Sequence, residues 1–199
     1  MATKGAGMTI ALLLFLFPLA YSPGPGNLIF AANGARFGVR ATLPASLGYH
    51  LATWGLTFAI GLGFGGVIAA APGLARALQV AGAGYVLWLA ARMARSGAVT
   101  HGAQARVLGL GGGALLLVLN PKAHVIIALM FSQFLARPDP VLVAWVTTVF
   151  TFNNLVAFTL WTLAGDALAR QFRHAAAARR LNRLFAVMLA GVALWMLAR

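Results

Sequence analysis

The sequence contains no cysteine and only 2 acidic residues among 199. Without cysteine there can be no disulfide, no thiolate catalysis and no cysteine-based metal site. Charged residues make up 9% of the chain and hydrophobic residues 61%, whereas an ordinary soluble domain is about one quarter charged. These proportions indicate an integral membrane protein, in which short connections leave no room for a soluble catalytic domain.

Basic residues are the one abundant kind of charge, with 15 Lys and Arg giving a formal net charge of +13. Such a charge can indicate nucleic-acid binding. Here the basic residues lie between apolar runs, so membrane topology and anionic headgroups explain them better. We therefore expect a lipid bilayer and no nucleic acid as a partner.

The apolar runs predict an all-α membrane protein with six transmembrane helices, since a crossing takes about 20 residues. The runs cover residues 8–33, 41–71, 74–93, 107–134, 141–165 and 184–198. Asp166 is expected just past the fifth run, and the five arginines within 170–183 suggest an amphipathic segment or short loop on the membrane surface. A signal peptide is an alternative for the first run, but the run continues past the small residue Ala20.

The distribution of basic residues predicts the orientation of these helices. Ten of them fall in the connections after the first, third and fifth runs, and four fall on the opposite side. Positively charged connections stay in the cytoplasm. Both termini are therefore expected outside.

Two of the runs are interrupted by residues that break a helix. The first holds Ser22-Pro23-Gly24-Pro25-Gly26-Asn27 and the fourth holds Asn120-Pro121-Lys122-Ala123-His124. Proline removes a backbone donor and glycine frees the dihedrals, so each run should form two half-helices. A break is costly in hydrocarbon unless it is buried against protein or lines a cavity. Both breaks are thus candidate sites.

The breaks also predict an internal repeat. Pro23 lies 15 residues after Met8, and Pro121 lies 14 after Val107, so the breaks fall at matching depths. With three helices each, repeat one (about 1–104) and repeat two (about 105–199) of the single domain 1–199 would be inverted, each opening with a broken helix. Paired interruptions in inverted repeats indicate the binding site of a secondary transporter.

The residues at the breaks favour an anion. Asn120 is expected to cap a helix that starts at Pro121, and Ser22-Pro23 and Gly24-Pro25 offer the same arrangement. Both helix N-termini would carry partial positive charge. Lys122, in the first turn of one, requires an anion in the membrane or gives up its proton, unless it reaches an interface. No Asp or Glu lies within the spans, so a substrate carboxylate is its natural counter-ion.

Other polar residues in the spans have two interpretations. Backbone carbonyls, with Asn27, Asn153 or Asn154, could accept hydrogen bonds from a substrate ammonium, although Asn153 and Asn154 could equally serve helix packing. His50 and His124, with Lys122, are candidates for proton coupling, and for each histidine a structural hydrogen bond is the alternative. Among the glycines of the second run, the pair Gly61 and Gly65 favours helix packing.

Several motifs resemble the LysE/RhtB family of bacterial amino-acid exporters. They are Pro-Gly-Pro-Gly-Asn at 23–27, Leu-Asn-Pro-Lys-Ala at 119–123, Leu-Gln-Val-Ala-Gly-Ala-Gly-Tyr at 78–85 leading to Arg92-Met93, and Leu-Asn-Arg at 181–183. The resemblance implies six helices in the bacterial cytoplasmic membrane, amino-acid export and coupling to protons. It carries over a functional core of Pro23, Gly24, Pro25, Asn27, Asn120, Pro121 and Lys122. It does not include His50 or His124.

The absence of a buried acid predicts a neutral or small polar amino acid as substrate, not a cationic one. An enzyme is disfavoured because the spans offer two separated histidines and no acid for acid–base or metal chemistry. A channel, a structural membrane subunit or a carrier for another small solute are the alternatives. We expect no cofactor and no metal, and a homodimer is consistent with so small a carrier.

Overall fold

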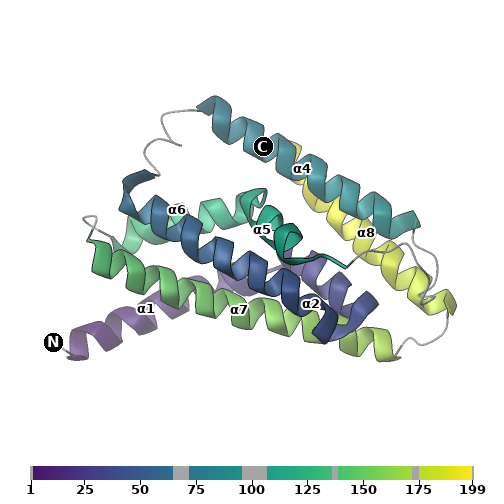
Figure 1. Cartoon of the computed structure of the whole chain (residues 1–199), viewed down its shortest axis with the longest axis horizontal. Coiled ribbons are helices and arrows are strands. Elements are labelled where there is room, and N and C mark those ends of the chain that lie inside the picture. The colour runs from purple at the N-terminus through teal and green to yellow at the C-terminus, as the bar shows by residue number, and fades with distance from the viewer. Residues whose placement is uncertain (1, 65–71, 96–106, 136–138, 172–174, 199) are drawn as a thin grey trace.

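The computed structural model describes residues 2–64, 72–95, 107–135, 139–171 and 175–198 (Figure 1). Within these ranges the regular structure is entirely helical: α1 (Ala2–Tyr21), α2 (Pro25–Ala59), η1 (Ile60–Phe64), α4 (Pro72–Arg95), α5 (Leu110–Val118), α6 (Pro121–Phe134), α7 (Pro140–Gln171) and α8 (Ala175–Ala198). The all-helical fold expected from the sequence is confirmed. The connections at 65–71 and 96–106, and Gly65 with them, lie outside the described residues.

Both expected helix breaks are present. The chain bends by 64° between α1 and α2, and by 62° between α5 and α6. Counted with these bends, the described residues offer up to three membrane spans by length and composition: α7 alone, α1 with α2, and α5 with α6. The arrangement of six spans as inverted repeats stays a prediction.

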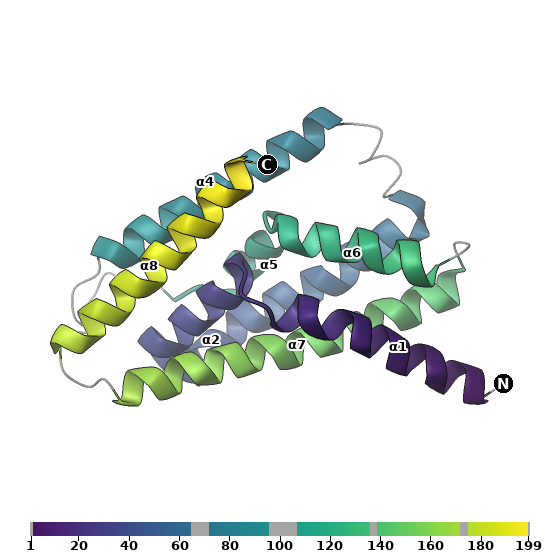
Figure 2. The ribbon, with the colours of Figure 1, turned by 180° about the vertical axis from the view of Figure 1, so that it is seen from behind.

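Helix α2 extends from the first expected span into the second, but its backbone is interrupted at Gly38. Gly38 inside α2 has φ +81° and ψ 168°, which is not helical and suits glycine alone. Figure 2 shows the chain turning back at this end of α2. The turn lies between Arg36 and Arg40, where the sequence places the first connection.

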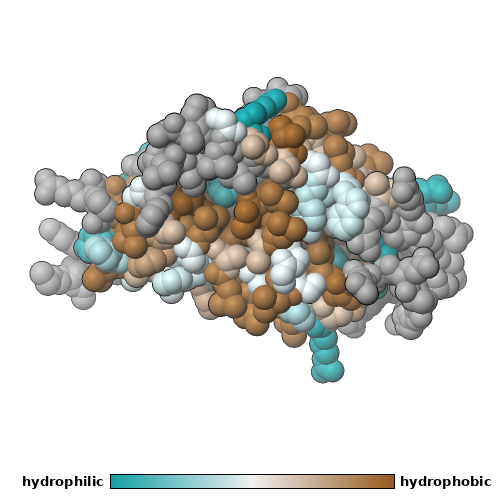
Figure 3. Space-filling view, turned by 45° about the horizontal axis from the view of Figure 1, so that its top comes forward, coloured by the Kyte–Doolittle hydropathy of each residue, from teal (hydrophilic) through white to brown (hydrophobic). Residues whose placement is uncertain are grey.

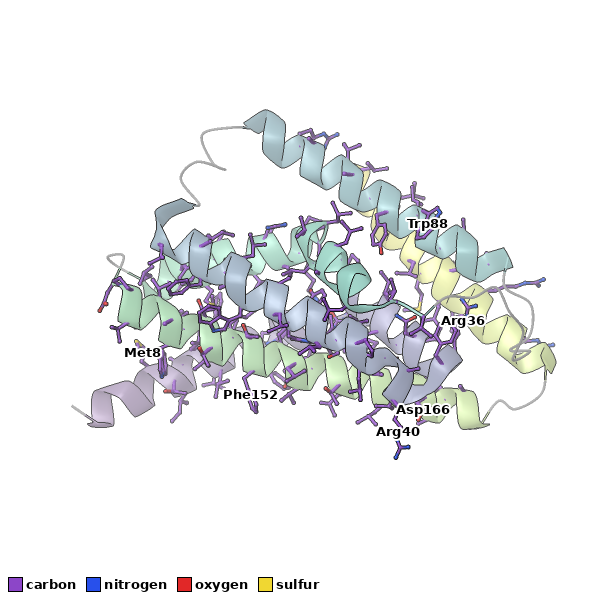
Figure 4. All side chains as sticks on the ribbon, in the orientation of Figure 1. Met8, Arg36, Arg40, Trp88, Phe152 and Asp166 are labelled. Carbon is purple, nitrogen blue, oxygen red and sulfur yellow. The ribbon has the colours of Figure 1, made fainter. Side chains whose placement is uncertain are left out.

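The C-terminal third departs from the sequence prediction. Helix α7 continues to Gln171, so Asp166 lies inside it, with Oδ1 3.9 Å from the position of a Cβ on Gly38. Helix α8 begins at Ala175, so Arg179, Arg180 and Arg183 belong to its first turns and do not form a surface loop. A run of four alanines at 175–178 has high helix propensity, which explains the early start. Arg36, Arg40 and Asp166 gather at one end of the bundle, and Met8 lies toward the other (Figure 4).

The helices pack in pairs. α2 lies along α7 and contacts α5, while α4 lies beside α8 on one side of the bundle in both ribbon views (Figures 1 and 2). Large apolar side chains remain exposed over much of the surface, among them Leu14, Val141, Phe152 and Val187, and Figure 3 shows a broad hydrophobic face. Such a surface suits contact with lipid chains.

Glycines set the closest helix contacts. A Cβ on Gly34 of α2 would lie 2.1 Å from the Thr162 carbonyl oxygen of α7, and one on Gly165 would lie 1.9 Å from the Ala31 carbonyl oxygen. Gly48 of α2 and Gly113 of α5 make the same kind of reciprocal contact, each at 1.9 Å from a carbonyl oxygen of the other helix. These two crossings were not predicted.

The glycine predicted to pack does so. A Cβ on Gly61 would lie 2.5 Å from Val143 and 2.6 Å from Phe131. Small residues at such places let helices approach closely in a membrane. At the other two crossings, each glycine lies three residues after the carbonyl that its partner glycine contacts. A search for pairs of glycines four residues apart does not find this pattern.

Candidate functional site

The two helix breaks lie against each other. A Cβ on Gly24, just before α2, would be 2.7 Å from Cδ of Lys122 in α6. A Cβ on Gly26 would be 3.1 Å from Nδ2 of Asn120. The first turns of α2 and α6 therefore meet, so two helix N-termini converge on one place. Their partial charges favour an anion there.

Both helices begin as the sequence predicts, with proline in the first turn. Gly24 precedes Pro25 at the start of α2, and Asn120 precedes Pro121 at the start of α6. Two details were wrong. The Asn120 side chain makes no capping hydrogen bond, and Ser22-Pro23 precedes the start of α2 at Gly24-Pro25, with Pro23 exposed.

The role of Gly24 is to leave space. Its φ of −163° and ψ of 173° are extended backbone angles that any residue adopts, so dihedral freedom is not the reason for glycine. The Lys122 side chain occupies the volume that a Cβ would take, with Nζ only 3.1 Å from it. Gly26 makes room in the same way for the Phe158 ring, whose Cζ is 2.8 Å from the Cβ position.

Lys122 connects the two breaks. Its ammonium donates to the Ser22 carbonyl oxygen at 2.6 Å and to Ser22 Oγ at 3.1 Å, in a half-buried position. The side chain therefore points to the opposite break and does not reach for an interface. An ammonium has three donors, and Ser22 receives two of them. One donor direction remains for an anion.

Side chains on the second half of each broken helix bond back to the first half. Asn27 Nδ2 donates to the Ala20 carbonyl oxygen at 3.0 Å, and His124 bonds through Nε2 to the Val118 carbonyl oxygen at 2.8 Å. A free carbonyl at a helix C-terminus is costly in hydrocarbon. Asn27 and His124 thus satisfy carbonyls at the breaks, a structural role in this conformation.

A tyrosine that sequence reasoning missed lies directly behind the breaks. Tyr49 is fully buried, and its hydroxyl accepts a hydrogen bond from Asn120 Nδ2 at 3.0 Å. It also interacts with the side chain of Asn154. Its ring packs against Phe158 with centroids 4.6 Å apart, and against Phe30 at 5.7 Å. The available signal was a tyrosine directly before His50 within the second expected span.

Two buried polar atoms near Tyr49, and one on Asn153 of α7, have no partner among the described residues. They are Asn120 Oδ1, His50 Nε2 and Asn153 Nδ2. His50 Nδ1 lies 2.7 Å from the Ser46 carbonyl oxygen, so it carries the proton of a neutral ring and donates it there. Nε2 then bears a lone pair. Buried polar atoms in this state suit a ligand or water.

The structure thus brings most of the predicted residues to one region. Those at or next to the paired breaks are Pro23, Gly24, Pro25, Asn27, Asn120, Pro121, Lys122 and His124. Asn154 and His50 adjoin them through Tyr49, whose ring is 5.3 Å from that of His50. Within the described part of the chain, no three His, Asp or Glu residues gather as a metal site would need.

Comparison with known proteins gives a family for the chain. A family model of the LysE type translocator matches residues 17–199. An uncharacterized membrane protein of Vibrio cholerae serotype O1 is 28% identical over 92% of each chain. Cysteine/O-acetylserine efflux proteins of Salmonella typhimurium and Escherichia coli K12 are 29% and 28% identical, over 85% of this chain and 87% of theirs.

No solved structure matches the chain. The family model covers nearly the whole sequence, including both helix breaks and the residues that join them. The resemblance seen in the sequence motifs is therefore confirmed, and the chain belongs to the LysE type translocator family.

Proposed function

We propose that this protein exports neutral or small polar amino acids across the bacterial cytoplasmic membrane, with both termini outside. The observation that carries the proposal is the meeting of two helix N-termini at Lys122, joined across the breaks to Ser22. The names of the cysteine/O-acetylserine efflux relatives support this substrate class. Both of those substrates are neutral amino acids.

The substrate carboxylate would bind between the breaks. Lys122 and the first turns of α2 and α6 provide positive charge, and the Lys122 ammonium would exchange its hydrogen bonds to Ser22 for hydrogen bonds to the carboxylate. Backbone carbonyls at the breaks and the Oδ1 atom of Asn120 would accept hydrogen bonds from the ammonium group of the substrate. Asn153, whose Nδ2 has no partner among the described residues, would then contact the side chain of the substrate.

A cationic amino acid would not be bound well. A second ammonium or a guanidinium needs a carboxylate, and the chain has only Asp139 and Asp166. Asp139 precedes α7, where its Oδ1 accepts from the Val141 amide at 3.0 Å. Asp166 lies beside Gly38 near the far end of the same helix. Neither is at the breaks.

We further propose that export is coupled to proton exchange through Lys122 and His50. Lys122 would alternate between a form paired with the substrate and a form paired with Ser22. His50 is favoured over His124 as a second carrier, because His50 Nε2 is buried without a partner among the described residues, whereas His124 Nε2 is engaged by a carbonyl.

The inverted repeat would supply the transport movement. The two breaks, with bends of 64° and 62°, would occupy corresponding places in the halves, and α2 packs along α7, the helix that follows the second broken span. Two halves of this kind can rock about a central site and expose it to each side in turn.

The test is export from bacterial cells loaded with dipeptides, followed by mass spectrometry of amino acids in the medium. We compare the parent protein with Lys122→Met and with Lys4→Met, the same change at the only other lysine. We expect cysteine, O-acetylserine or other neutral amino acids to leave faster with the parent and Lys4→Met only. Export of arginine in place of neutral amino acids would contradict the substrate class.

The coupling is tested by counterflow driven by a pH gradient in proteoliposomes. Lys122→Arg keeps the charge but holds its proton far more firmly. We expect this variant to lose pH-driven counterflow. Full counterflow in Lys122→Arg would remove the role of a titrating lysine, and unchanged pH dependence in His50→Gln would remove that of His50.

A further inference from the structure

A row of polar side chains leads away from the site between α2 and α7. On α2 they are His50, Thr53 and Thr57, and on α7 they are Thr147, Thr151 and Asn154. Spacings of three and four residues put each set on one face of its helix. All but Thr151 are at most 6% exposed. We call these six residues the α2–α7 polar seam.

The helix register shows that the two sets face each other. Trp54 Nε1 donates to Thr148 Oγ1 at 3.1 Å, and a Cβ on Gly61 would touch Val143. These contacts bracket Thr57 and Thr147, and they show that α2 and α7 run in opposite directions here. The same register puts Thr53 level with Thr151, and His50 level with Asn154.

Three of the four threonine hydroxyl groups in the seam have no partner among the described residues, while the fourth, that of Thr53, donates to the Tyr49 carbonyl oxygen at 2.8 Å. A threonine in a membrane helix commonly donates to the carbonyl four residues earlier, as Thr148 and Thr159 do at 2.7 Å in α7. The Oγ1 atoms of Thr57, Thr147 and Thr151 make no hydrogen bond to any described residue. Buried polar atoms without partners are costly in a membrane protein, unless water or a polar ligand reaches them.

An apolar contact closes the seam at the end away from the breaks. Beyond Thr57 and Thr147, the backbone at Gly61 lies against Phe131 of α6 and Val143 of α7, and both side chains are buried. This end is also where α2 gives way to the π-helix η1, in which Gly63 has φ +105°. A π-helical turn often marks a functional position.

We propose that the α2–α7 polar seam is the route by which the substrate and water pass between the paired breaks and the membrane face where α7 begins. Contact among Gly61, Phe131 and Val143 closes this route in the present conformation. The proposal rests on the proposed function. In the orientation predicted from the basic residues, that face is the outer one, so the seam is the exit route of an exported amino acid.

The seam suits the proposed substrate class. Threonine hydroxyls can donate and accept, so they can replace water around a zwitterion without holding it by charge. The two helices present nothing charged between the breaks and the closing contact, since the row contains only Thr, Asn and His. A passage of this kind lets a neutral amino acid leave without being bound tightly on the way.

The chain's lack of cysteine allows a direct test, because each variant then carries a single thiol. Thr53→Cys, Thr57→Cys and Thr147→Cys are exposed to a charged, membrane-impermeant methanethiosulfonate, in intact cells and in inverted vesicles. The controls are Leu51→Cys and Phe152→Cys, at the same level but 60% and 66% exposed on the outer surface of the bundle. Phe152 points away from the bundle in Figure 4.

We expect the seam thiols to react in intact cells at least about tenfold faster than the controls, because thiolates and charged reagents do not enter hydrocarbon. Added O-acetylserine should slow the reaction of Thr53→Cys. Seam thiols that react as slowly as the controls would overturn the proposal, as would reaction only in inverted vesicles. Phe131→Ala should speed the reaction of Thr57→Cys further, since it removes part of the closing contact.

Labelling does not require export to be measured, so the two proposals can fail separately. If the seam thiols react but the parent protein exports no amino acid, the proposed function fails and a water-filled route remains. If export is intact in the unlabelled variants and the seam thiols stay unreactive, the route is wrong and the proposed function stands.

Discussion

Replacing Gly165 with alanine tests whether the crossing of α2 and α7 holds the bundle together. The added Cβ would lie 1.9 Å from the Ala31 carbonyl oxygen, about 1.5 Å short of ordinary contact, which begins at 3.4 Å. The obstacle is helix backbone, which cannot turn aside as a side chain can. The helices must separate along a crossing at which a Cβ on the other glycine, Gly34, would lie 2.1 Å from the Thr162 carbonyl oxygen.

The expected cost is the upper part of the range for overpacking, about 2–3 kcal/mol. For a chain of this length each kcal/mol corresponds to roughly 2–4 °C, so the melting temperature should fall by about 4–12 °C. The measurement is thermal unfolding of detergent-purified protein followed by tryptophan fluorescence. Export should also fall, since the crossing positions the start of α2.

The matched control is Gly191→Ala in α8, where nothing lies within 4 Å of the new Cβ. Alanine there should leave the melting temperature unchanged or raise it, because alanine favours a helix over glycine by up to about 1 kcal/mol. If Gly165→Ala and Gly191→Ala have the same melting temperature, α2 and α7 do not approach each other as closely at Gly165 as the structure has them, and the reasoning is refuted.

Three further changes separate binding from folding. Gly24→Ala should reduce export but shift stability by less than about 0.5 kcal/mol, because its Cβ meets only the flexible Lys122 side chain; a large fall in melting temperature would argue against this. Tyr49→Phe should cost about 1–3 kcal/mol in thermal unfolding, since it leaves the buried Asn120 amide without its partner, and an unchanged melting temperature would contradict that bond. His124→Leu should cost about 1 kcal/mol and leave the pH dependence of export intact; loss of that dependence would make His124 a proton carrier.

The breaks could be located from sequence because their signals are local. Proline fixes where a helix starts regardless of the rest of the fold, so Pro25 and Pro121 predicted two helix starts correctly. Similar distances from the starts of their runs, 15 and 14 residues, then predicted that the breaks would lie at matching depths. Lys122 was recognised for the same reason, since a charged residue amid leucines and isoleucines is unusual.

The partners of the breaks were beyond sequence reasoning because they depend on packing. The hydroxyl that binds Asn120 belongs to Tyr49, 71 residues earlier in the chain. Asn27 is predicted to accept from a substrate ammonium, but its sequence position could not show that its Nδ2 donates to the Ala20 carbonyl oxygen. The end of α7 and the start of α8 were misplaced because arginine signals a membrane surface but also has high helix propensity.

The bond between Lys122 and Ser22 has a consequence for affinity. The ammonium is already compensated before any substrate arrives, so a carboxylate that draws it away from Ser22 must compete with the protein itself. Hydrogen bonds to a charged group contribute about 1.5–3 kcal/mol each, and each 1.4 kcal/mol is about tenfold in affinity. Giving up even one of them weakens binding by about 10–100-fold. This competition would suit export. A weakly bound amino acid is released quickly, and the lysine then returns to its hydrogen bonds with Ser22.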